Sequence, residues 1–163
     1  MLRALEDHLG SPQVSRVIYG AIIGLALVVA LEAHPPRPVA VVATLIGTAV
    51  AVGLAELYSE AIGEETRTRR RIHADHLRHF AVDAGAVGVG VAFPAVFFVL
   101  AAADALEPDT AFTVAKWSGL GLIGFYGFAA ARLAGASVPG SLVRALAVGV
   151  IGGMLIALKA LIH

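Results

Sequence analysis

Long stretches without charge alternate with short charged ones along this chain. The uncharged runs are residues 17–31, 38–55, 84–103, 117–131 and 145–158. Continuous apolar runs of this kind predict membrane-spanning helices, because lipid offers the backbone no hydrogen-bond partner and a helix satisfies its own groups. We therefore expect an all-α integral membrane protein with five transmembrane helices, over approximately 14–33, 39–62, 81–103, 112–132 and 141–161.

The composition supports a single transmembrane domain over residues 1–163. Hydrophobic residues make up 58% and charged residues 15% of the chain, and the mean hydropathy of +0.84 is far above that of soluble domains. The sequence contains no cysteine, which excludes disulfides and thiolate metal ligands. A formal net charge of zero argues against a nucleic-acid partner. Because no nucleophile, phosphate-loop or cofactor motif is present, we expect neither an enzyme nor a tightly bound cofactor.

Basic residues are distributed unevenly between the two sides of the five predicted spans. With the N-terminus in the cytoplasm, nine of them lie inside and three outside, which satisfies the positive-inside rule. We therefore expect an integral protein of the bacterial inner membrane with a cytoplasmic N-terminus. The three outer residues are Arg37, Lys116 and Lys159.

A charged segment, residues 63–80, lies between the second and third predicted spans, on the cytoplasmic side. Glu56, Glu60 and Glu64 lead into it at intervals of four, so a second-span helix that continues into the cytoplasm carries them on one face. Counting about 30 Å of hydrocarbon along this helix leaves Glu56 at or inside the inner edge, where an ionisable group is a functional candidate. For Glu64, exposure to water or an ion pair with an arginine of the same segment is an equally good interpretation.

Histidines follow in the same segment. His76, His79 and Asp83 share one helical stripe, and imidazole and carboxylate groups at this spacing can bind one divalent transition metal. A helix at the membrane surface that binds anionic lipid headgroups explains the same segment. Under that second interpretation the headgroups are bound by Arg67, Arg69, Arg70 and Arg71.

Small residues spaced four apart occur in the first, second and fifth predicted spans. This spacing predicts close helix packing, within one protomer or across the interface of a homodimer. In the third span, glycines that precede Pro94 also fit a kinked helix that moves during transport. The packing glycines are Gly20, Gly24, Gly47, Gly149 and Gly153.

The stretch SEAIGEE at 59–65, which ends a span rich in small residues, resembles the SMxxGEYxS signature of the vacuolar iron transporter family. RVIYGAIIGLALV resembles the family's first-span segment, and AGASVPGSLVRALAVGVIGG resembles its loop and basic residue before the last span. The resemblance covers all five predicted spans and implies a symmetric homodimer that exchanges Fe²⁺ or Mn²⁺ for protons. By this resemblance Ser59, Gly63 and Glu64 occupy signature positions.

The chain differs from the family at positions that matter for metal binding. Ile23 stands where the family has a first-span Asp that coordinates the metal, and Glu60 stands where the signature has Met. The cytoplasmic metal-binding insertion is reduced to about residues 64–80. The resemblance therefore implies either a site rebuilt around Glu56 and Glu60 or a relative that no longer moves iron.

Two functions from different classes follow. In the first, Glu56 and Glu60 of two protomers bind Fe²⁺ or Mn²⁺, with Zn²⁺ as a further candidate, and protons compete for the same carboxylates. His76, His79 and Asp83 then form a weaker collecting site outside the membrane. In the second, the protein is a non-transporting scaffold that binds lipid or a partner protein. Flux without metal selectivity would indicate a cation channel instead.

Overall fold

The structure is a computed structural model that describes residues 13–69 and 74–162. Within these ranges the chain forms helices and no strand, which confirms the prediction of an all-α protein. The second, fourth and fifth predicted spans each fall within one helix, the first extends two residues beyond the end of its helix, and the third is divided between two. In chain order the helices are α2 (Gln13–Leu31), α3 (Pro38–Thr68), α4 (Ala74–Ala92), α5 (Ala95–Ala102), α6 (Pro108–Leu133) and α7 (Val138–Ile162).

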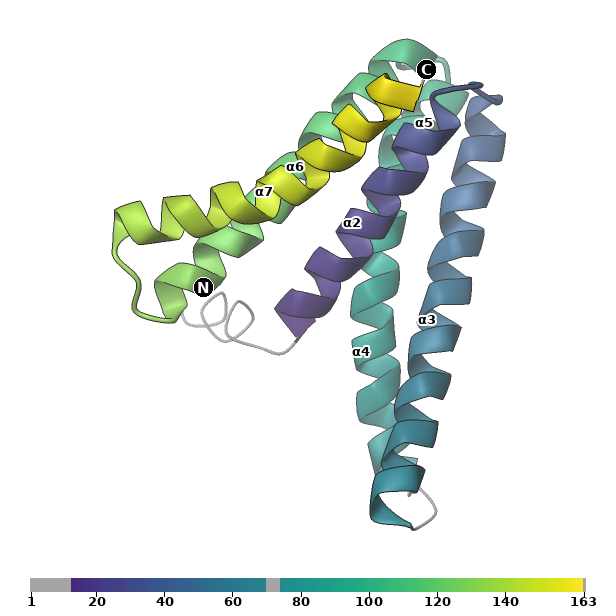
Figure 1. Ribbon diagram of the computed structural model, residues 1–163. Coiled ribbons are helices and arrows are strands. Elements are labelled where there is room, and N and C mark those ends of the chain that lie inside the picture. Colours follow the sequence, from purple (N-terminus) through teal and green to yellow (C-terminus); the bar gives the residue numbers. More distant parts are fainter. Residues whose placement is uncertain (1–12, 70–73, 163) are drawn as a thin grey trace.

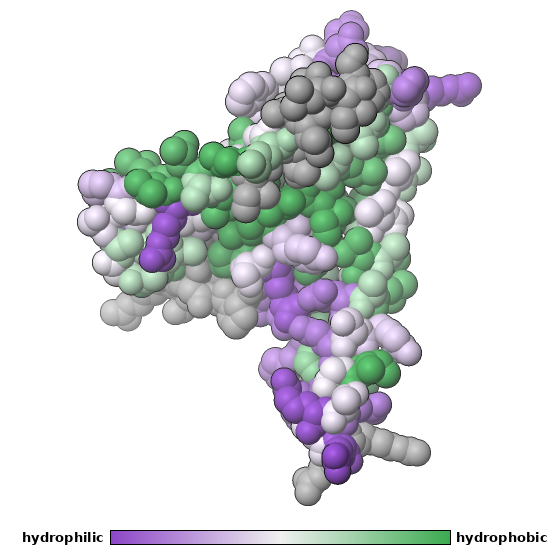
Figure 2. Space-filling view, in the orientation of Figure 1, coloured by the Kyte–Doolittle hydropathy of each residue, from purple (hydrophilic) through white to green (hydrophobic). Residues whose placement is uncertain are grey.

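Helix α2 lies at the centre of the arrangement, where it packs against α4, α6 and α7, while α3 packs against α4 and α5. Helices α3 and α4 form a long antiparallel pair whose far ends project beyond the other helices (Figure 1). Helices α6 and α7 form a second hairpin, inclined away from that pair. Figure 2 shows that hydrophilic residues gather on the projecting end of the α3–α4 pair, and that apolar residues dominate the rest of this face.

Helix α3 is a single helix of 31 residues. Pro38 suits its first turn, because the N–H groups there need no partner within the helix. The chain leaves it at Arg69, which adopts the left-handed conformation with φ of 53°. At 1.5 Å per residue α3 is about 46 Å long, against about 30 Å of hydrocarbon in a bilayer. The second predicted span thus continues beyond its apolar run as one helix, as the sequence predicts.

The third predicted span is broken at Pro94. Helix α4 ends at Ala92, α5 begins at Ala95, and the pair is bent by 49°. Proline lacks an N–H and its ring clashes with the carbonyl four residues earlier, so a helix bends or stops there. After the break, the Phe97 N–H donates to the Pro94 carbonyl three residues back, at 3.2 Å, which tightens the first turn of α5.

Helices α2 and α3 are long and apolar enough to cross a membrane, and α4 with α5 makes a third such span if the bent pair is counted as one. By the same measure α6, which contains Lys116, does not qualify, and within α7 the segment Val138–Val150 is a shorter apolar helix. The described residues thus contain two or three candidate spans by length and composition. This finding supports a membrane protein and leaves the prediction of five spans unestablished.

The buried core consists of two apolar clusters on either side of α2. One joins α2, α3, α5 and α6, and its largest members are Phe98 and Phe112, whose rings meet edge to face with centroids 4.7 Å apart. The other joins α2 to α6 through Leu25 and Ile123. Because α2 contributes to both clusters, its orientation depends on the packing of its neighbours.

Glycines bring α2 and α4 into direct backbone contact. A Cβ added at Gly20 would lie 2.0 Å from the Val87 carbonyl oxygen, and one added at Gly90 would lie 2.4 Å from the Val17 carbonyl oxygen. A Cβ at Gly24 would meet the Val91 carbonyl oxygen at 2.8 Å. The small-residue pattern at Gly20 and Gly24 therefore corresponds to a close helix crossing, for which Gly90 supplies the opposite surface.

Candidate functional site

Three helices meet at a group of charged side chains near the start of α2. Arg16 of α2 donates a hydrogen bond from Nη1 to Glu56 Oε1, at 2.5 Å, and another from Nη2 to Glu60 Oε1. Asp83 of α4 adds a third carboxylate, with its Oδ2 atom 3.4 Å from Arg16 Nη2. We call these four residues the Arg16 cluster.

The glycine crossing sets the register of this cluster. Arg16 precedes Gly20 by one turn of α2, and Asp83 precedes Val87 by one turn of α4. Because Gly20 lies against the Val87 backbone, Arg16 and Asp83 are brought to the same level. On α3, the spacing of four between Glu56 and Glu60 directs both carboxylates to the same side, where one guanidinium can bond to both.

The side chains of the Arg16 cluster are mostly enclosed. Their exposed fractions lie between 21% and 28%, so water screens their charges only in part. The second carboxylate oxygen of Glu60, Oε2, is buried and has no hydrogen-bond partner among the described residues. A buried carboxylate oxygen without a partner is costly, so this atom is free to accept a proton or a cation.

The charges in the cluster do not balance. When ionised, three carboxylates carry −3 and the guanidinium carries +1, which leaves −2. Glu56 lies 18 residues after Pro38, or about 27 Å along α3, close to the roughly 30 Å depth of the hydrocarbon. If α3 spans a bilayer, an excess negative charge at this depth would attract a cation, because few water molecules would be present to stabilise it.

No ready-made metal site accompanies this charge. Among residues 13–69 and 74–162, no three His, Cys, Asp or Glu side chains are arranged so that they could hold a metal ion. In the Arg16 cluster the guanidinium stands between the carboxylates and holds the position that an ion would need. A metal could bind to these oxygens only if Arg16 moved away from at least one of them.

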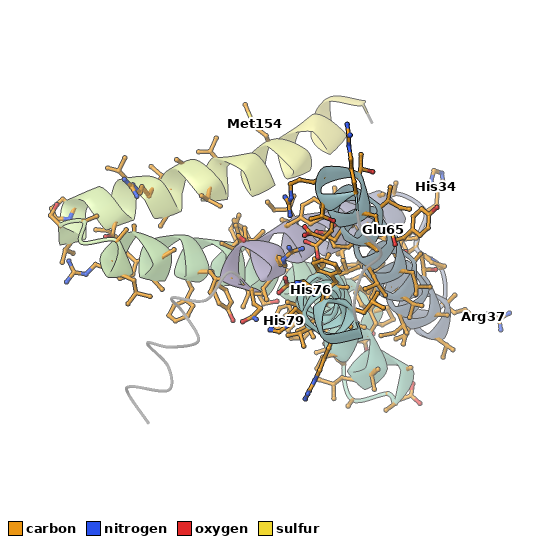
Figure 3. All side chains as sticks on the ribbon, turned by 90° about the horizontal axis from the view of Figure 1, so that it is seen from below. His34, Arg37, Glu65, His76, His79 and Met154 are labelled. Carbon is orange, nitrogen blue, oxygen red and sulfur yellow. The ribbon has the colours of Figure 1, made fainter. Side chains whose placement is uncertain are left out.

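The acidic stripe predicted on α3 divides into two parts. Glu56 and Glu60 belong to the Arg16 cluster. Glu64, one turn further, forms an ion pair with Arg67 of the same helix, which was one of the interpretations left open for this residue. Glu65 lies exposed near the end of α3 (Figure 3). Within a single protomer each acid of the stripe therefore has a basic partner, although Glu56, Glu60 and Asp83 share one guanidinium.

The structure does not assemble His76, His79 and Asp83 into a set of metal ligands. Asp83 faces Arg16, while His76 and His79 lie exposed on α4, nearer the projecting end of the α3–α4 pair (Figure 3). The three residues share one stripe of α4, but the carboxylate of Asp83 is paired with Arg16 of α2. The predicted collecting site is therefore incomplete in this arrangement.

The remaining predicted residues lie on the surface of the protomer or outside the described ranges. Arg67 and Arg69 are exposed at the end of α3, where lipid headgroups can reach them, and Arg70 and Arg71 lie outside the described residues. A Cβ added at Gly47, Gly149 or Gly153 would meet nothing within 4 Å. Among the described residues, these three glycines therefore make no close contact with another helix.

A second ion pair ties α2 to its neighbours at the opposite end. Lys116 of α6 donates from Nζ to Glu32 Oε1 at 2.6 Å. This pair joins one cation to one anion, so it carries no excess charge comparable with that of the Arg16 cluster. The pair therefore serves as a reference for the contribution to stability of an ion pair that has no proposed role in ion binding.

Sequence reasoning recognises Glu56 and Glu60 but does not identify their partner Arg16. The signal available was a single arginine at the start of an apolar helix, one turn before a packing glycine, and at the same predicted depth as Glu56. Comparison of the chain with protein-family models, with curated proteins and with solved structures finds no match.

Proposed function

We propose that the protein is a five-span transporter that moves a divalent cation such as Fe²⁺ or Mn²⁺ across the membrane in exchange for protons. The Arg16 cluster is the proposed ion site, with Glu56, Glu60 and Asp83 as ligands. Its excess of two negative charges supports this proposal most directly, because one divalent ion neutralises it. The resemblance of SEAIGEE to the iron transporter signature gives independent but weaker support.

Arg16 has a specific role in this proposal. In the empty site its guanidinium stabilises the carboxylates, and an entering ion displaces it from at least one of them. Oxygen ligands suit Fe²⁺ and Mn²⁺, and a protonated carboxylate is a poor ligand. Two protons therefore replace the ion, and the returning guanidinium neutralises the third carboxylate.

One observation favours a different function. Between the Arg16 cluster and the Lys116–Glu32 pair, the interior is filled by the two apolar clusters. A protein whose charged groups serve only to fasten α2 to its neighbours would show the same arrangement, with ion pairs at both ends of α2 and an apolar interior between them. On that view the chain is a membrane scaffold and the Arg16 cluster is a structural ion-pair network.

Metal uptake into proteoliposomes with an internal metal-sensitive dye tests the transporter. The parent protein should take up Mn²⁺ or Fe²⁺, and uptake should increase when the lumen is more acidic than the outside. The double variant Glu56→Gln and Glu60→Gln keeps the side-chain size but removes two charges, so uptake should be lost. The control variant Lys116→Gln removes an ion pair at the other end of α2 and should keep uptake.

Removing Arg16 separates the two functions. If the cluster is an ion site, Arg16→Gln should tighten Mn²⁺ binding in calorimetry, because the internal competitor is gone. If the cluster is only structural, neither the parent protein nor Arg16→Gln should bind Mn²⁺ measurably. Equal uptake by the parent and by the double Gln variant would eliminate these carboxylates as the transport site.

A further inference from the structure

An apolar groove follows the seam between α3 and α4. It has a volume of about 500 Å³, is open to the outside, and is lined almost entirely by carbon. Large side chains such as Ile46 and Leu57 stand beside Gly85 and Gly88, whose missing side chains create the space. None of the four residues of the Arg16 cluster lines it. The groove is therefore separate from the proposed ion site.

The length of the groove matches one leaflet of a bilayer. Its lining extends along α3 from Ile46 to Leu57, a rise of about 16 Å along the helix axis. One leaflet provides about half of the 30 Å hydrocarbon thickness. Leu57 also lies about 28 Å along α3 from Pro38, so the groove ends where α3 leaves the hydrocarbon.

A cation stands at the end of the groove where headgroups are found. On α4, the lining residues Ala81, Gly85, Gly88 and Ala92 form one helical stripe, and Arg78 continues this stripe by one further turn. Arg78 is exposed. Glu56 and Glu60, the acids at this level, bond to Arg16, and among the described residues neither forms an ion pair with Arg78.

We propose that this groove binds one acyl chain of an anionic phospholipid, whose phosphate is held by Arg78. The inference rests on the membrane arrangement proposed above and does not depend on the ion site. The carbon lining accommodates the acyl chain, and the match in length places the headgroup beside a guanidinium that can bond to its phosphate.

Native mass spectrometry of the detergent-solubilised protein tests the site, with phosphatidylglycerol and phosphatidylcholine of identical chains as probes. Gly85→Leu should fill the groove without strain, because a Cβ there meets nothing within 4 Å. Each buried CH₂ contributes a factor of about four in affinity, so displacing two should reduce binding of both lipids by roughly tenfold or more. Gly121→Leu, on α6, is the matched control, since its Cβ also meets nothing within 4 Å.

Substitution of Arg78 tests the headgroup contact. Arg78→Gln should reduce phosphatidylglycerol binding about fivefold and phosphatidylcholine binding less, because both lipids present a phosphate but the choline ammonium of the second offsets its charge. Arg78→Lys should retain most of the preference. The double variant Glu56→Gln and Glu60→Gln should bind both lipids normally, so failure of the ion site and failure of the lipid site give different results.

Two outcomes would overturn the proposal. If Gly85→Leu and Gly121→Leu retain equal amounts of both lipids, the groove is not the binding site. If the parent protein has the mass of a dimer and Gly85→Leu has the mass of a monomer, the groove is occupied by a second copy of the chain.

Discussion

Helices α2 and α3 are both apolar and rich in small residues, but their surroundings differ. Of the most apolar 18-residue window, 44% is buried in α2 and only 17% in α3. Gly20 of α2 lies against the backbone of α4, whereas Gly47 of α3 has nothing within 4 Å. Small residues four apart therefore permit a close crossing, and a second small surface opposite them, such as Gly90, is needed to form it.

The largest effect that separates the two helices should come from the α2–α4 crossing. Gly20→Ala places a Cβ 2.0 Å from the Val87 carbonyl oxygen, so the helices must move apart. We expect a loss of about 3 kcal/mol in the free energy of unfolding, at the upper end for overpacked sites. Thermal unfolding in detergent measures it. Gly121→Ala is the control and should be neutral or slightly stabilising, because alanine favours a helix over glycine. Similar stability for the two variants would contradict a close crossing.

The next largest effect should come from the charged end of α2. Arg16→Gln leaves three partly buried carboxylates without their cation, which should cost about 2 kcal/mol because the groups are only partly screened by water. Thermal unfolding measures the loss, and added Mn²⁺ should recover part of it if the site binds the ion. A melting temperature equal to that of the parent would show that the ion pairs do not fasten α2.

A smaller loss is expected at the other end of the same helix. Lys116→Gln removes the cation of the partly exposed ion pair with Glu32, and pairs of this kind contribute at most about 1 kcal/mol. The same unfolding assay should show this difference, with no response to Mn²⁺. A loss greater than that for Arg16→Gln would reverse the ranking of the two ends of α2.

The smallest effect is expected on the exposed face of α3. Gly47→Leu adds a side chain where the protomer has no neighbour, so stability should change by less than about 0.5 kcal/mol. Mass measurement in detergent gives the second readout. If the parent is a dimer and this variant is a monomer, Gly47 belongs to an interface between two copies, and the contrast between α2 and α3 holds only within one protomer.

The helical content and the approximate ends of the helices could be predicted from the sequence, because uncharged runs and the residues that interrupt them are local signals. Pro94 likewise marked the break between α4 and α5. The number of membrane spans could not be predicted from the same local signals. Helix α6 mixes apolar residues with Lys116, and its length does not compensate for its polarity.

The Arg16 cluster could be predicted only in part. Glu56 and Glu60 stood out by their depth and their spacing, but their partner is 40 and 44 residues away in the sequence. Pairing of that kind depends on how far each helix is rotated about its axis. The contact at Gly20 determines this rotation, and the pattern of residues along the sequence does not reveal it. The same contact brings Asp83 of α4 to the level of Arg16, with which it pairs.

The separation of Arg16 from its acids also constrains how the chain enters a membrane during synthesis. At 5 to 20 residues per second, a ribosome needs about 2–8 s to extend the chain from Arg16 to Glu56. Throughout that interval α2 carries a guanidinium for which the carboxylates have not yet been made. If α2 and α3 span the membrane as proposed, we expect stable insertion of the first helix to await the second, so that the two leave the insertion machinery together as a pair.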